Sequence, residues 1–122
     1  MLLAIEGVTV IAIVPLVKEH GPELFDLEHS FRIKHLDEMS IVAEAVSNVV
    51  KPDKMNYELL GNGCPHIHWH LYPRVKGDTP IVSSVYQLSD NELFDEAARP
   101  DEEQREELKK MIKNEIIRLR SK

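Results

Sequence analysis

The most regular pattern in the chain is a short segment in which histidines alternate with large apolar residues. Between Pro65 and Pro73 the sequence reads His-Ile-His-Trp-His-Leu-Tyr. Side chains of a β-strand point to alternate faces with a period of two, whereas a helix would scatter them by about 100° per residue. The pattern therefore predicts a strand that carries His66, His68 and His70 in a row on one face. Its apolar residues would point the other way, into a core.

Two other apolar segments predict further strands. Residues 8–14 form a continuous apolar run that fits a buried strand, and residues 55–60 fit a second one. The second strand reaches the histidine segment through Gly61-Asn62-Gly63, and a short glycine-rich loop favours an antiparallel pair. We expect no membrane span around residues 8–17, because Pro15 interrupts a run well short of the roughly 20 residues that a span needs. This segment also lacks the basic flank and cleavage site of a secretory signal.

The sequence predicts two long helices, from helical periodicity, and two shorter helical segments. Apolar residues recur at steps of three and four over residues 29–49 and again over 101–120. Ser30 or Asp26 would cap the first helix, and Pro52 would end it. A helical turn is predicted within residues 22–27, and a capping-box pattern predicts a short helix from Asp90. The apolar stripes are Leu36, Met39, Ala43, Val46 and Val50 in the first long helix and Leu108, Met111, Ile112, Ile116 and Leu119 in the second.

Composition narrows the class of protein. A chain of 122 residues that is 43% hydrophobic and 30% charged fits one compact globular domain. The net charge of −6 argues against general binding to a nucleic-acid backbone, which requires a basic surface. The single cysteine, Cys64, excludes an internal disulfide and a four-cysteine zinc site. We therefore expect a cytoplasmic protein that binds neither nucleic acid nor membrane.

Three histidines on one strand face suit phosphoryl transfer. A neutral imidazole is a nucleophile near pH 7, and its protonated form supplies a proton and a positive charge. Same-face neighbours on a strand stand roughly 7 Å apart, so one phosphate could contact all three rings. Only His68 is flanked on both sides by another histidine, which makes it the natural nucleophile.

The same residues carry a resemblance to a known family. Residues 66–72, preceded by Met-Asn-Tyr-Glu-Leu-Leu-Gly-Asn-Gly at 55–63, resemble the His-φ-His-φ-His-φ-φ signature of the histidine triad (HIT) nucleotidyl hydrolases and transferases. The resemblance implies an α+β fold, with an antiparallel sheet of about five strands, one long helix on it and C-terminal helices. Residues 1–88 would form the HIT domain, and residues 89–122 a helical extension of the same domain. It also implies a homodimer.

The resemblance implies a reaction as well. The substrate would be a nucleoside phosphoanhydride or phosphoramidate, such as diadenosine polyphosphate or an adenosine phosphoramidate. His68 would attack the α-phosphorus and form a nucleotidyl-histidine, while His66 and His70 orient the phosphate and leaving group. Asn62 and Asn56 match amide positions that contact phosphate. No cofactor is required for the covalent step, although magnesium could accompany a polyphosphate substrate.

Two departures from the family leave a second function open. Many relatives carry a fourth histidine where this chain has Val10, and the segment before residue 8 is short where relatives build part of the nucleoside pocket. A nucleotide-binding regulatory protein with little turnover is therefore an alternative. The base, the leaving group and the pathway are not indicated.

Other interpretations concern metal binding and the remaining side chains. Three histidines on one face could hold zinc, but no carboxylate or cysteine stands at ligand spacing. Trp69 is expected to pack in the core and Arg74 to lie on the surface after the strand. The other histidines are expected to be solvated or in loops: His20, His29 and His35.

Overall fold

A computed structural model describes residues 2–5, 8–13, 22–63, 65–93 and 100–122. The predictions for Val14, His20 and Cys64 lie outside these residues. The elements, in chain order, are β1 (Leu2–Ile5), β2 (Val8–Ile13), the 3₁₀ turn η1 (Leu24–Asp26), α1 (His29–Val50), β3 (Lys54–Glu58), β4 (Trp69–Arg74), the 3₁₀ turn η2 (Val85–Gln87), α2 (Asp90–Leu93) and α3 (Glu102–Arg120). The α+β class predicted from the sequence is confirmed.

The strands form one antiparallel sheet in the order β1-β2-β4-β3. The described part of the chain thus contains four strands, where the sequence analysis expected about five. Strand β2 corresponds to the apolar run at residues 8–14, and β3 pairs with β4 as the glycine-rich connection indicated. Strand β1 lies in a segment for which the pattern predicted no element.

The histidine strand begins later than predicted. Strand β4 starts at Trp69, so His70 lies within it while His66 and His68 precede it. A β-strand extends only as far as neighbouring strands pair with it. Here β3 ends at Glu58, opposite His70, and the last described pair with β2 is between Ile13 and Trp69. The prediction of a strand from His66 is therefore wrong by three residues, because the pattern of side chains does not show where the partners end.

Pro73 does not end the strand either. It lies inside β4, fully buried, and pairs with Met55 of β3. A proline has no N–H for a sheet ladder and is tolerated where one side of a strand needs no donor. The described pairs between β2 and β4 extend only to Leu71, so Pro73 lies beyond them.

Helix α1 has the predicted length and a different cap. Glu28 is its N-cap, and the carboxylate accepts hydrogen bonds from the backbone N–H of Ser30 at 3.0 Å and of Phe31 at 3.2 Å. A glutamate is an uncommon N-cap, which is why Ser30 or Asp26 was expected instead. Lys51, with φ of 57°, ends the helix just before Pro52.

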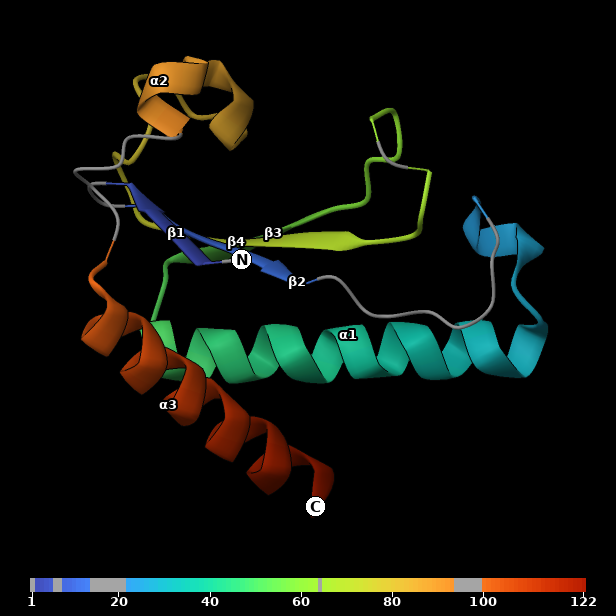
Figure 1. Cartoon of the computed structure of the whole chain (residues 1–122). Coiled ribbons are helices and arrows are strands. Elements are labelled where there is room, and N and C mark those ends of the chain that lie inside the picture. The colour runs from blue at the N-terminus through green and yellow to red at the C-terminus, as the bar shows by residue number, and fades with distance from the viewer. Residues whose placement is uncertain (1, 6–7, 14–21, 64, 94–99) are drawn as a thin grey trace.

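The core lies between α1, the sheet and α3. Figure 1 shows α1 running along one side of the sheet and α3 crossing α1 near its carboxyl-terminal end. Most of the predicted stripes pack here, but Met111 is about half exposed. The buried residues of this core are Ala43, Ala45, Val46, Met55, Leu71 and Ile112. Helix α3 therefore packs against the same core as α1 and the sheet.

Candidate active site

Strand β4 separates two chemically different faces. Trp69 and Leu71 point toward α1, since they line a cavity together with residues of that helix. The alternate residues His70, Tyr72 and Arg74 lie on the other face, where residues 83–86 approach them. His70 therefore lies on the face of the sheet opposite α1.

His68 and His70 lie side by side at the start of β4. Their ring centroids are 4.9 Å apart, with the planes tilted by 45°. Nδ1 of His68 lies 2.7 Å from the backbone carbonyl oxygen of His66. A carbonyl oxygen only accepts hydrogen bonds, so Nδ1 of His68 carries the hydrogen. Nε2 of a neutral His68 is then left with its lone pair, which is the form a nucleophile needs.

His66 and Asn62, the predicted phosphate-binding amide, line one cavity of about 330 Å³, together with Glu23 from the segment before α1. Asn62 is exposed and follows β3 in the loop that leads to the histidines. The structure thus brings Asn62 to the first histidine, while the other two histidines follow directly in the chain. The remaining lining residues are Pro22, Leu59, Leu60, Gly61, Pro65 and Ile67.

His70 has a defined polar environment. Its Nδ1 lies 2.9 Å from the hydroxyl of Tyr72, and that hydroxyl lies 3.3 Å from the hydroxyl of Tyr86. Burial lowers the pKa of His70, and the nearby His68 lowers it further. Neutral imidazole is therefore favoured at this position.

Asn56 and Arg74 are engaged with one another rather than with the histidines. Oδ1 of Asn56 accepts a hydrogen bond from Nη1 of Arg74 at 2.9 Å. Arg74 also forms a bidentate ion pair with Asp78, at 2.6 and 2.7 Å. Its side chain is 9% exposed, so the prediction of a surface arginine is wrong. The phosphate-binding role of Asn56 stays a prediction.

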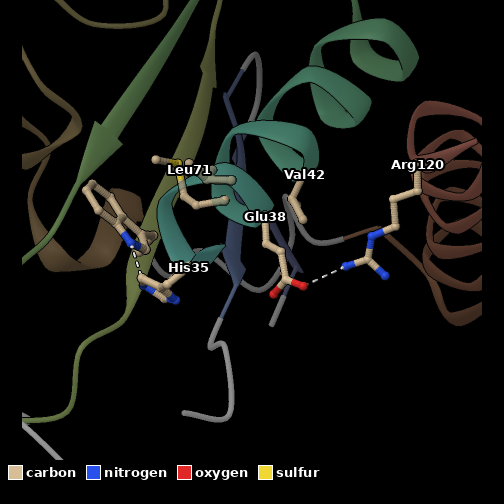
Figure 2. A pocket seen from close by; sticks show the side chains of 7 residues that line it. His35, Glu38, Val42, Leu71 and Arg120 are labelled. Atoms are coloured by element: carbon tan, nitrogen blue, oxygen red, sulfur yellow. Dashed lines mark hydrogen bonds and ion pairs between the residues drawn. The ribbon is translucent and has the colours of Figure 1, made fainter. Parts of the chain in front are cut away.

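The expectation of a solvated His35 is also wrong. This residue lies on α1 and is 6% exposed, and its Nε2 accepts a hydrogen bond from Nε1 of Trp69 at 3.1 Å. His35 lines a cavity of about 200 Å³. Figure 2 shows this residue together with the Glu38–Arg120 ion pair at the same cavity. Trp69 packs toward the core as predicted, and its indole N–H has a partner there. This cavity lies on the α1 face, away from His68 and His70.

The zinc alternative receives no geometric support. Across the described ranges, which include all three histidines of the motif, no group of three His, Cys, Asp or Glu side chains is arranged to hold a metal ion. The carbonyl contact of His68 does not choose between the two interpretations, because it leaves Nε2 free either to attack phosphorus or to bind a metal ion. No helix within those ranges has the length and apolar character needed to cross a bilayer.

Comparison with known proteins decides the family. The sequence model of the HIT domain matches residues 7–77, which is more than half of the chain. The chain belongs to the HIT family. HIT proteins are nucleotide hydrolases and transferases, so nucleotide processing is the general activity of this class. A search of curated proteins found no match.

Solved HIT structures share the fold. A histidine triad protein from Marinobacter aquaeolei VT8 superposes with a TM-score of 0.73 at 25% identity, over 95% of this chain and 80% of that chain. A HIT protein from Sinorhizobium meliloti 1021 gives 0.70 at 22% identity, over 91% and 78%. One from Bradyrhizobium japonicum gives 0.70 at 23% identity, over 89% and 75%. The last two likenesses concern the fold alone.

Three polar residues around His70 were missed by the sequence analysis. Tyr72 continues the period-two row of the histidines, and this spacing could have placed it on their face. Glu58 lies opposite His70 in the β3–β4 register, and Tyr86 reaches Tyr72 from η2. Neither position can be read from a sequence whose register and loop path are unknown.

Proposed function

We propose that this HIT protein hydrolyses a nucleoside phosphoanhydride or phosphoramidate through a nucleotidyl intermediate on His68. The observation that carries this proposal is the contact between Nδ1 of His68 and the carbonyl of His66, because it leaves Nε2 as the free nitrogen. Diadenosine polyphosphates and adenosine phosphoramidates are the two substrate classes. The protein is proposed to act in the cytoplasm.

In the first step, the Nε2 lone pair of His68 attacks the α-phosphorus. The phosphorus–nitrogen bond forms as the bond to the leaving group breaks, and the leaving group departs with a proton. In the second step, water attacks the same phosphorus, gives up a proton and releases a nucleoside monophosphate and free His68. His66, His70 and Asn62 would contact the phosphate oxygens and the leaving group.

The covalent step needs no metal, because a protein nitrogen is the nucleophile. Magnesium would enter only with a polyphosphate substrate, whose charge it would partly neutralise. We also propose a homodimer. In the described sheet β3 pairs only with β4, so its other edge is available to a second copy. Sedimentation velocity should give the mass of two chains, and a monomer at high protein concentration would contradict this.

Turnover of the two substrate classes tests the proposed function. Wild type, His68→Ala and His29→Ala would be assayed on a diadenosine polyphosphate and on an adenosine phosphoramidate, with and without chelator. His29 is an exposed residue of α1 and serves as the matched control. We expect wild type and His29→Ala to release AMP at equal rates. The rate of AMP release by His68→Ala should be at least a thousandfold lower. Nucleotide binding without turnover in wild type would instead favour the regulatory alternative, and chelator-sensitive activity would favour a metal site.

A further inference from the structure

A row of polar side chains leads away from His70 on the sheet face opposite α1. The contacts run from Nδ1 of His70 to the hydroxyl of Tyr72, and from there to the hydroxyl of Tyr86. Glu58 lies opposite His70 in the sheet register, and the Tyr86 hydroxyl lowers the pKa of its carboxyl group. These residues come from β4, η2 and β3, so three separate elements meet at His70.

We propose that Tyr72, Tyr86 and Glu58 form a proton relay that makes His70 the group that protonates the leaving group. The proposal rests on the proposed function, since it assigns the proton that the leaving group takes. Tyr72, Tyr86 and Glu58 act through His70, so they are positioning residues.

The direction of each hydrogen bond follows from the state of Glu58. When Glu58 is ionised, Tyr86 donates to it and must accept from Tyr72, which in turn accepts from Nδ1–H of His70. When Glu58 is protonated, every bond reverses, and Nδ1 accepts from Tyr72 while Nε2 carries the hydrogen. The same four side chains thus support two proton arrangements without any movement of the backbone.

The two proton arrangements of these side chains account for every proton moved in the two steps of the reaction. As the leaving group departs, Nε2 of His70 gives it a proton and Nδ1 takes one from Tyr72. Tyr72 is reprotonated by Tyr86, and Tyr86 by Glu58, which becomes a carboxylate. In the hydrolytic step the water proton enters at Nε2 of His70 and the relay runs backward, so Glu58 recovers its proton. No net charge is left on His70 at the end of either step.

The burial of Tyr72 and Glu58 suits these residues to their roles in the proposed relay. Tyr72 is 4% exposed, and burial raises the pKa of its phenol, so it stays neutral and can both donate and accept. Burial also raises the pKa of Glu58, although the Tyr86 hydroxyl and the Arg74 charge oppose this. Oε2 of Glu58 is inaccessible to solvent and has no hydrogen-bond partner within the described part of the chain. Such an oxygen disfavours the ionised carboxyl group.

On the other side of β4, the described position of β2 that pairs with His70 is an alanine. Ala12 of β2 pairs with His70, and alanine neither titrates nor forms side-chain hydrogen bonds. Among the described residues, the titratable groups placed near His70 are His68, Tyr72 and Tyr86, with Glu58 opposite it in the register, and Arg74 acts on Glu58.

Two substrates that differ only in the leaving group separate a relay from simple structural support. An alkylamine must be protonated to leave an adenosine phosphoramidate, whereas p-nitrophenolate leaves the nitrophenyl ester of AMP without a proton. We expect Tyr72→Phe and Glu58→Gln to lower kcat on the phosphoramidate about 10- to 100-fold, with KM little changed. On the nitrophenyl ester, the single-turnover release of p-nitrophenolate should stay within about threefold of wild type for both variants, because hydrolysis of the intermediate, in which the relay also acts, follows that release. Equal losses on both substrates, or no loss on the phosphoramidate, would overturn the relay.

A matched control and a pH profile accompany this comparison. Tyr57 lies next to Glu58 on β3, is 48% exposed and pairs with Leu71, so Tyr57→Phe should match wild type on both substrates. The wild-type rate on the phosphoramidate should fall as pH rises through the pKa of Glu58, because the relay starts from the protonated carboxyl group. Glu58→Gln should lack that fall. A fall that persists in Glu58→Gln would contradict the relay.

An NMR measurement keeps the relay testable if no substrate is turned over. Inactive wild type with no adduct on His68 would remove the proposed function, but it would leave the hydrogen bonds of His70 open to measurement. At pH 8, ¹⁵N shifts of wild type should place the His70 hydrogen on Nδ1, and Tyr72→Phe should move it to Nε2. The same tautomer in both proteins would overturn the relay.

Discussion

At the scale of single residues, two histidines show how position decides chemistry. Nδ1 of His68 contacts a backbone carbonyl, which fixes its hydrogen and exposes Nε2. Nε2 of His35 is instead occupied by the indole N–H of Trp69 inside the core. This contact fits the proposed role of His68 as nucleophile, whereas His35 is a structural hydrogen-bond acceptor.

Replacing His35 with glutamine should flatten the pH dependence of stability. Burial lowers the pKa of His35 from its ordinary value of 6.5, although Glu38 opposes the shift. The stabilisation by neutral His35 is thus complete above pH 6.5 and is lost as pH falls through the lower pKa of the folded state. The glutamine amide oxygen can still accept from Trp69, but it does not titrate.

Urea titrations of wild type and His35→Gln between pH 8 and pH 5 measure this effect. The free energy of unfolding of the variant should decline less toward pH 5 than that of wild type. Parallel declines in the two proteins would mean that His35 takes up its proton as readily when folded as when unfolded.

At the scale of elements, hydrogen bonds from Arg74 hold the segment after β4 against the sheet. Its guanidinium binds Asp78 with two hydrogen bonds and also donates to the hydroxyl of Thr79 and the carbonyl of Ser83. This segment leads to η2, which carries Tyr86 over Tyr72. The buried ion pair therefore fixes one side of the environment of His70.

Removing the charge of Asp78 should cost more stability than removing an exposed one. Asp78→Asn leaves the guanidinium of Arg74 buried without its counter-ion, and the expected loss is about 3 kcal/mol. Glu106→Gln breaks an exposed pair with Lys109 and should leave the free energy of unfolding close to that of wild type. Chemical denaturation at pH 7 compares the two, and equal losses would show that the burial of Arg74 contributes nothing.

At the scale of the whole molecule, α3 completes the core that α1 and the sheet begin. Ile112 is buried against this core, and Asn48 of α1 donates a 2.7 Å hydrogen bond to Glu115 of α3. We therefore propose that residues 89–122 extend the HIT domain rather than form a separate unit.

Two isoleucines on α3 test this arrangement. Ile112→Ala should lower the free energy of unfolding by at least about 2 kcal/mol, because it leaves a cavity in the core. Ile117 is 58% exposed, and its replacement by alanine should change stability by no more than about 0.5 kcal/mol. Both variants should unfold in one transition by circular dichroism. A separate early transition of Ile112→Ala would indicate that α3 folds independently.

The sequence predicted local features well and long-range partners poorly. Helical periodicity located α1 and α3, because the repeat is set within each segment. The start of β4, the Arg74–Asn56 contact and the burial of His35 depend on which strand or helix lies opposite, which no local pattern encodes. The missed polar partners of His70 come from β3 and η2 for the same reason. The motif thus indicates the proposed nucleophile, His68, but not the residues that surround His70.

The most direct test of the account is a search for the covalent intermediate on His68. Wild type and His68→Ala would be incubated with an adenosine phosphoramidate, quenched in base, where phosphohistidine bonds survive, and analysed by mass spectrometry of their peptides. The account predicts an adenylyl increment on His68 in wild type, unchanged by chelator, and none in the variant. Turnover by wild type with no adduct, or an adduct on another residue, would contradict it.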